Sequence, residues 1–201
     1  MKGFGYALGR RWVDMTDDQR DLMLDGIVHD ADRMDAIVRQ LVDAAKVMSG
    51  RFEAYVELTD TGDLVGQIAE QQARDPEHPP IEWAGGADKA LVDAGRLKTT
   101  IMAFVEALAW WGDEGPIRVG GAVRDGRLLV SASRGAGTAT TDVDTLFEAR
   151  RPGTGGGSKI GLYVARRVAE AQGGRAWGEL TEGRLTFHVE LPIAGRDSPT
   201  P

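Results

Sequence analysis

The longest regular pattern in this sequence is a run of apolar residues, mostly three or four apart, between Thr16 and Ser49. Its apolar positions are Met23, Ile27, Met34, Ile37, Leu41, Ala44 and Met48. This spacing places the apolar side chains on one face of an α-helix. Thr16 followed by Gln19 has the pattern of a capping box at the start of a helix, and Gly50 is a stop signal. The sequence therefore predicts one long helix with an apolar seam, which needs a partner surface.

The residues before this helix predict a second helix. Phe4–Val13 carries the aromatic and apolar side chains of a helix end, and only Asp14 and Met15 separate it from Thr16. So short a link favours two antiparallel helices. The long helix would extend roughly 50 Å, too far to be covered by one short neighbour. We therefore expect the hairpin to form a homodimer in which each copy supplies half of a four-helix bundle. The interface residues that we expect are Ile27, Met34, Ile37 and Leu41.

From Arg51 onward, short strands alternate with helices and glycine-rich turns. Strands are predicted at 54–58, 81–83, 90–92, 117–123, 127–133, 175–179 and 185–191, and helices at 64–73, 95–111 and 160–171. Asp125-Gly126 predicts a two-residue hairpin turn, and 134–159 is predicted as a loop. The predicted fold class is α+β, a helical hairpin followed by an α/β sandwich. The predicted divisions are a hairpin at 1–50, an α/β domain at 51–194 and a disordered tail at 195–201.

Composition narrows the function classes. Hydrophobic residues make up 42% and charged residues 27% of the 201 residues, values of a globular chain rather than a disordered one. No apolar run approaches the roughly 20 residues that cross a bilayer, so we expect no membrane contact by this chain. The absence of cysteine excludes disulfides and thiol chemistry. A net charge of −7 argues against non-specific nucleic-acid binding. The unusual feature of the composition is the total of 27 glycines, several of which fall in short motifs.

Several segments resemble the motifs of one family in their order and spacing. They are Ala31–Val47 on the long helix, the helix Arg96–Trp111, Ser133–Gly137, Leu146–Glu148, Gly153–Gly155 with Gly161–Arg166, and Val168–Gly174. Taken together, they resemble the cytoplasmic core of a two-component sensor histidine kinase, a dimerisation hairpin followed by an ATP-binding domain of the Bergerat type. The helix 96–111 stands in place of the family's asparagine box. The later segments stand in place of its first glycine box, phenylalanine box and second glycine box.

The glycines have a physical role of their own. A loop that brings backbone N–H groups against a triphosphate cannot carry side chains there, and a following helix N-terminus favours negative charge. Pro152–Lys159 fits this description and adds a lysine as a phosphate cation. The structural alternative is a flexible exposed loop before a helix. The candidate nucleotide-binding residues are Glu106, Ala107, Ser133, Gly135, Gly137, Gly153, Thr154, Gly155, Gly157, Lys159 and Gly161.

The resemblance also implies ligands that this sequence lacks. The family's magnesium-binding asparagine falls at Ala107, which has no oxygen, and the chain contains no asparagine at all. The lysine that follows in the family falls at Trp110, and the aspartate that binds the adenine amino group falls at Ser133. Glu106 keeps an acid beside Ala107 and is the candidate for approaching magnesium. Loss of a hydrogen bond to a charged group costs about 1.5–3 kcal/mol of binding.

The family's phosphoacceptor histidine would lie shortly before Lys2-Gly3, a place that precedes Met1. We therefore expect no catalytic residue in this chain. His29 reads as a solvent-facing residue of the long helix, His78 lies in a proline turn and His188 in the last strand.

The resemblance implies ATP and magnesium as cofactors, a response-regulator receiver domain as partner and a cytoplasmic location. The first hypothesis is a histidine kinase core whose intact relatives phosphorylate a histidine and pass the phosphate to an aspartate. The second is a pseudokinase scaffold that dimerises and binds a signalling partner without ATP turnover. The third is a different Bergerat-fold ATPase or an anti-sigma-type serine kinase, which the long hairpin disfavours. We predict that this chain alone cannot autophosphorylate.

Overall fold

The structure is a computed structural model that describes residues 9, 12–49, 51, 53–74, 78–86, 89–112, 115–136, 143–148 and 159–193. The chain forms two compact units, Met1–Val42 and Asp43–Pro201. No helix in the described ranges is long and apolar enough to cross a membrane. The proposed tail 195–201 lies outside the described residues, and the proposed boundary at residue 50 stays a prediction.

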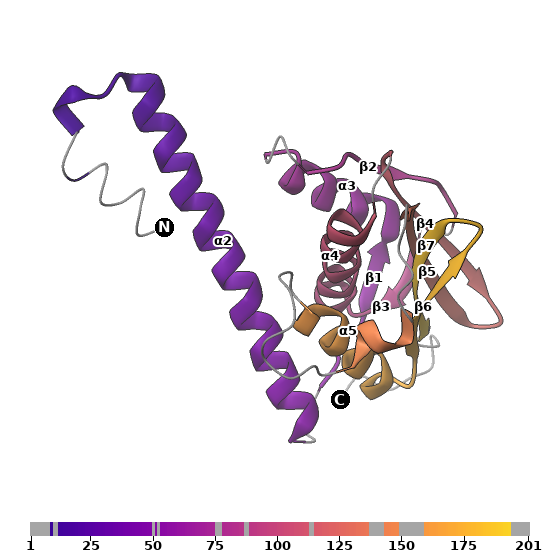
Figure 1. Ribbon diagram of the computed structural model, residues 1–201. Helices are drawn as coiled ribbons and strands as arrows, with labels where there is room; N and C mark the ends of the chain where they lie inside the picture. Colours follow the sequence, from indigo (N-terminus) through magenta and orange to yellow (C-terminus); the bar gives the residue numbers. More distant parts are fainter. Residues whose placement is uncertain are drawn as a thin grey trace. The chain divides into compact units, whose positions relative to one another are not determined.

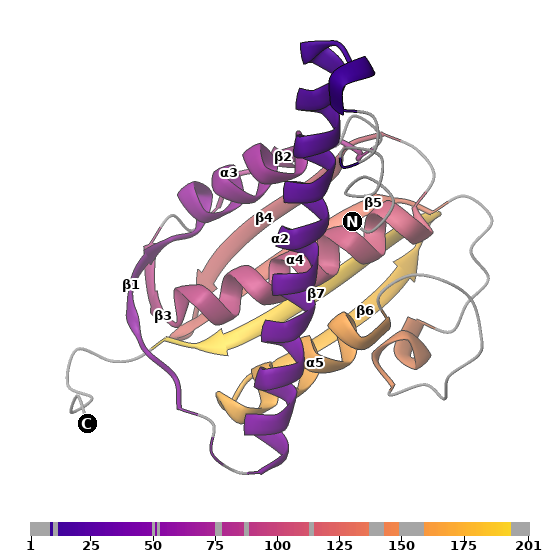
Figure 2. The ribbon, with the colours of Figure 1, turned by 90° about the vertical axis from the view of Figure 1, so that its left-hand side faces the viewer.

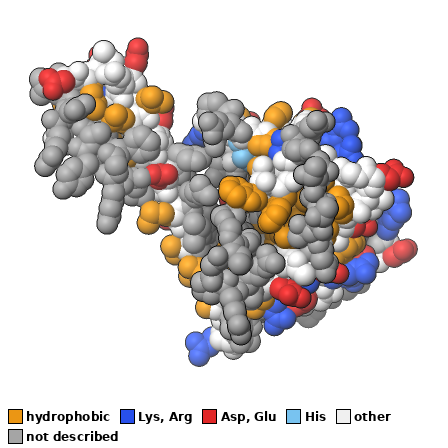
Figure 3. Space-filling model, in the orientation of Figure 1, with side chains coloured by type: hydrophobic (Ala, Val, Ile, Leu, Met, Phe, Trp, Pro, Cys, Tyr) orange, Lys and Arg blue, Asp and Glu red, His pale blue; other side chains and the backbone are white. Residues whose placement is uncertain are grey.

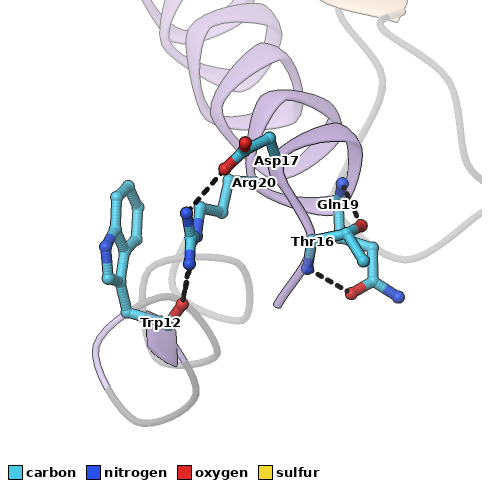
Figure 4. A network of polar contacts seen from close by, with 5 residues as sticks. All are labelled: Trp12, Thr16, Asp17, Gln19 and Arg20. Atoms are coloured by element: carbon cyan, nitrogen blue, oxygen red, sulfur yellow. Dashed lines mark hydrogen bonds and ion pairs between the residues drawn. The ribbon is translucent and has the colours of Figure 1, made fainter. Parts of the chain in front are cut away.

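The long helix α2 (Asp17–Met48) begins with the predicted capping box. The backbone N–H of Thr16 donates to Gln19 Oε1 at 3.1 Å, and that of Gln19 donates to Thr16 Oγ1 at 3.3 Å (Figure 4). At the other end, the Arg51 N–H donates to the Lys46 carbonyl at 3.0 Å, a bond typical of a helix that stops in a tight turn. Both predicted ends of this helix are therefore confirmed.

A short 3₁₀ helix, η1 (Trp12–Asp14), precedes α2. The Arg20 guanidinium ties it to the first turn, since Nη2 donates to the Trp12 carbonyl at 2.8 Å and Nη1 lies 2.7 Å from Asp17 Oδ1 (Figure 4). The predicted helix at 4–13 lies largely outside the described residues, so the hairpin stays a prediction.

The second unit contains a five-stranded sheet of order β2-β4-β5-β7-β6. Its strands are β2 (Ile81–Trp83), β4 (Ile117–Arg124), β5 (Arg127–Gly135), β6 (Arg175–Thr181) and β7 (Arg184–Pro192). β2 runs parallel to β4, and the other neighbours are antiparallel. β1 (Glu57–Asp60) and β3 (Lys89–Val92) form a separate antiparallel pair. The predicted turn at Asp125-Gly126 is confirmed, with φ of 51° and 71° at its two residues.

Three helices cover one face of the five-stranded sheet: α3 (Thr61–Gln72), α4 (Ala94–Trp111) and α5 (Lys159–Ala171) (Figures 1 and 2). Among the described elements, no helix covers the other face. The core between helices and sheet centres on Phe104, Phe147 and Phe187, whose ring centroids lie 5.6 to 6.4 Å apart. The predicted α+β class is confirmed.

Two predicted elements need correction. The first strand of the unit begins at Glu57 rather than at residue 54 and continues to Asp60, whose side chain accepts the Asp63 N–H and caps α3. The segment predicted as a loop from Arg134 contains the end of β5 and a 3₁₀ helix, η2 (Val143–Phe147). Tertiary packing explains η2, because Val143, Leu146 and Phe147 are all buried.

Candidate functional site

The C-terminal end of α4 carries the first two candidate residues. Asp93 caps the start of the helix by accepting the Arg96 N–H at 2.9 Å. Near the other end, Glu106 is partly buried and Ala107 is 8% exposed. Ala107 therefore places only a methyl group where the family resemblance puts a magnesium ligand. Among the residues that the structure describes, no group of three or more His, Cys, Asp or Glu residues is arranged to hold a metal.

Arg134 connects this helix end to β5. Its Nη1 donates to three main-chain oxygens at the end of α4, those of Leu108 at 3.2 Å, Ala109 at 3.3 Å and Gly112 at 3.0 Å. Its Nε donates to the Gly115 carbonyl at 3.0 Å. A cation at this position stabilises the negative end of the helix dipole. It adds hydrogen bonds to main-chain oxygens at the helix end, where the Leu108 carbonyl also accepts the Gly112 N–H at 2.9 Å.

Beside Arg134, the main chain at the end of α4 lies close to the main chain at the end of β5. A Cβ atom on Gly112 would lie 2.7 Å from Arg134 Cδ, 2.7 Å from the Leu108 oxygen and 2.9 Å from the Gly135 oxygen. No side chain larger than hydrogen fits there without a shift. The structure thus brings the glycine-bearing end of β5, with Gly135, against the last turn of α4, which carries Glu106 and Ala107.

Ser133 is not brought to the same place. In the continuous ladder of β5 it pairs with Arg118 of β4 and Thr186 of β7. Successive residues of a strand point to opposite faces, and the neighbouring Ala132 is fully buried on the helix side. Ser133 therefore lies on the face of the sheet opposite α4. On the helix side, the strand end presents Arg134 instead.

The second glycine box forms the start of α5. The helix begins at Lys159, and Gly161 is buried in its first turn. α5 packs against α4 and η2, so the two helices that carry candidate residues are neighbours. Several candidates lie outside the described residues: Gly137, Gly153, Thr154, Gly155, Gly157 and the side chain of Lys159.

Sequence reasoning missed Arg134 and Gly112 as site-building residues. The only available signal was their position, an arginine inside a glycine box and a glycine directly after a helix.

The histidines whose side chains are described make local contacts away from this helix end. His78 Nδ1 lies 2.8 Å from the Pro79 carbonyl, and His188 Nδ1 lies 2.7 Å from Ser131 Oγ with its ring stacked on Trp177. The side chain of His29 lies outside the described residues.

α2 carries a second candidate surface. Its large exposed apolar side chains include Leu24, Val28, Met34, Val38, Leu41 and Val42, and Ile27 is partly buried. Leu24 and Val38 fall on one seven-residue repeat with Ala31 between them, and Ile27, Met34 and Leu41 fall on the repeat three residues later. This is the pattern of a two-helix seam. Apolar side chains are visible along α2 in Figure 3. The predicted interface residue Ile37 has its side chain outside the described residues.

The chain is similar in sequence to two sensor proteins. No family model matches the chain. The sensor protein CutS of Streptomyces coelicolor is 29% identical over 146 residues, which cover 67% of this chain and 35% of that protein. CutS of Streptomyces lividans matches to the same extent. The chain thus spans about a third of the length of the curated relatives it matches.

Solved structures agree in fold. The histidine kinase AdeS of Acinetobacter baumannii superposes with a TM-score of 0.68 at 15% identity, over 96% of this chain and 93% of that chain. Full-length ShkA in complex with AMPPNP superposes with a TM-score of 0.67 at 22% identity, over 92% of this chain and 41% of that chain. The resemblance to sensor histidine kinases that the motifs indicate is therefore confirmed, and the chain shares their fold.

Proposed function

We propose that this chain is the dimerising, nucleotide-binding core of a two-component sensor histidine kinase. The observation that carries the proposal is the junction of α4 with the glycine-bearing end of β5, held by Arg134. The sequence similarity to CutS and the fold shared with AdeS and ShkA support it. The long helix of this chain, with its repeated apolar stripe, favours this family over other ATPases that share the α/β fold.

In this proposal, ATP lies against main-chain N–H groups of the two glycine boxes. The residues assigned to it are Gly135, Gly137, Gly153, Thr154, Gly155, Gly157 and Gly161. Backbone amides free of side chains and the N-terminus of α5 suit a triphosphate, and Lys159 supplies a cation at the start of that helix. When bound, ATP would supply the phosphoryl group for transfer to a histidine and then to a receiver-domain aspartate of a response regulator.

The proposal extends to the assembly of the protein. The apolar stripe of α2 would hold a homodimer, because a second copy offers the same stripe in the same repeat. We place this core on the cytoplasmic side, where a response regulator can reach it.

A second candidate function is a pseudokinase scaffold, and the described side of the site favours it. Ala107 offers no oxygen, Ser133 lies on the far face of the sheet, and the chain contains no asparagine. Magnesium does not fit the described residues, since Glu106 is the one described side chain with an oxygen in the last two turns of α4. None of His29, His78 and His188 is assigned as a phosphoacceptor. We therefore expect no incorporation of labelled phosphate by this chain alone, and labelling of any histidine would contradict this.

Calorimetric titration of ATP, with and without magnesium, tests the proposal. We expect micromolar binding. Binding that strengthens with magnesium would support a functional kinase site with unconventional ligands. Binding with the same affinity in the presence and absence of magnesium would favour a pseudokinase scaffold that still binds ATP. The absence of any heat would overturn the nucleotide site.

A matched pair of variants locates the binding. Lys159→Ala removes the proposed phosphate cation and should weaken ATP binding without changing the fold. Lys98→Ala makes the same change near the start of α4, at the opposite end from Glu106, and should leave binding unchanged. Equal ATP affinities of the two variants would show that Lys159 is not part of the nucleotide site.

A further inference from the structure

Arg166 of α5 makes three different contacts with the elements around η2. Its Nε donates to the Ala176 carbonyl of β6 at 3.0 Å. Its Nη2 lies 3.2 Å from Asp144 Oδ1. Its Cζ lies 4.3 Å from the ring centroid of Phe147. One side chain thus joins a helix, a strand and the 3₁₀ helix.

These contacts differ in strength. The ion pair to Asp144 is weak by itself, because the Asp144 side chain is 74% exposed and water screens the charges. The contact with Phe147 is better protected, because that ring is buried and packs edge-on against Phe104 and Phe187. A guanidinium over a buried ring gains a cation–π attraction that water does not fully screen. The bond to Ala176 holds the guanidinium over the ring.

The other end of η2 is fitted to β6. A Cβ on Gly178 would lie 2.5 Å from Val143 Cγ1 and 2.8 Å from Phe187 Cδ1. Val143 therefore occupies the space that a side chain at Gly178 would fill. η2 is fixed at its start by this fit and at its end by Arg166.

We propose that Arg166 is a positioning residue for the nucleotide site, acting through η2. This inference rests on the proposed function, because η2 lies in the sequence between the two glycine boxes assigned to ATP. Holding η2 against α5 and β6 fixes the described segment that lies between the two boxes in the sequence, next to the helix whose first turn carries Gly161. Arg166 itself need not contact the nucleotide. Its removal loosens η2 and, through η2, weakens nucleotide binding.

The first test measures η2 without nucleotide, by hydrogen exchange on the full chain. Arg166→Met keeps the length of the stem and removes the donors and the charge. We expect the amides of Leu146–Glu148 to exchange about tenfold faster, the combined effect of losing a cation–π contact and a partly exposed ion pair. Amides of the β4–β5 hairpin serve as the internal reference and should not change. Unchanged exchange in η2, or an equal rise in the hairpin, would overturn the anchoring role.

Arg167→Met is the matched control. Arg167 is the next residue, and its Nη1 pairs with Glu170 of the same helix at 2.7 Å rather than with η2. This variant should leave exchange in η2 unchanged. Asp144→Asn removes the exposed charge that pairs with Arg166 but leaves the contacts of Arg166 with Phe147 and Ala176, so it should raise exchange by less than Arg166→Met does. If Arg167→Met loosened η2 as much as Arg166→Met, the anchoring would not belong to Arg166.

The second test is the titration of ATP into the same variants. Arg166→Met should weaken binding by about threefold to tenfold, a range set by the loosening of η2, and Arg167→Met should not. If the unmodified chain bound no ATP, the proposed function would fail while the exchange experiment still decided the anchoring. If the unmodified chain bound ATP and Arg166→Met loosened η2 without changing affinity, the positioning role would be overturned.

Discussion

The two units of this chain bury their apolar residues in different ways. The α/β unit encloses its own core, with Phe104, Phe147 and Phe187 exposed by no more than 1%. α2 instead leaves large apolar side chains such as Val38 and Leu41 about half exposed. The α/β unit therefore forms its own hydrophobic core, whereas α2 leaves an apolar stripe exposed, as the proposed dimer requires.

The largest effect should come from opening the self-contained core. Phe187→Ala removes a fully buried ring that contacts the other two phenylalanines, and should lower the free energy of unfolding by about 3–5 kcal/mol. Chemical denaturation followed by tryptophan fluorescence, at one fixed protein concentration, measures this. Val123→Ala, at an exposed position of β4, is the control and should change stability by less than about 0.5 kcal/mol. Similar losses from the two variants would mean that the core is not closed.

The next effect tests the stripe of α2. Val38→Asp places a charge in the seam of each copy and should raise the dimer dissociation constant by about a hundredfold or more, because a buried unpaired charge is costly. Light scattering across a concentration series measures it. The control, Leu22→Asp, makes a similar change at a residue that is 72% exposed and lies off the repeat, so the dimer should persist. A chain that is monomeric before substitution would refute the association.

The comparison also explains what the sequence could predict. The capping box of Thr16 and Gln19 and the turn at Asp125-Gly126 depend on residues a few positions apart, so local patterns suffice. η2 and the bridge of Arg134 to α4 depend on contacts between segments far apart in the chain, which no local pattern records. The stripe of α2 is also a pattern of residues a few positions apart, so it is visible in the sequence.

The position of Ser133 is an intermediate case. The alternation of Leu128, Val130 and Ala132 with the residues between them already assigns Ser133 to the outer face of a strand. The family resemblance instead assigned Ser133 to the nucleotide site, because of its place in the glycine box. Strand alternation is a physical constraint on every side chain of β5, so it takes precedence over the position within a motif.

The smallest effect should come from the cap of α2. Thr16→Ala removes the hydroxyl that accepts the Gln19 N–H, and should destabilise the helix by about 1 kcal/mol. Because α2 has no core of its own, this loss should appear as faster hydrogen exchange in residues 17–20 and leave the α/β unit unchanged. Ser49→Ala is the control, since that hydroxyl donates to the Lys46 carbonyl at the opposite end of the helix. If Thr16→Ala lowered the stability of the α/β unit equally, the two units would unfold as one, and the contrast between them would not hold.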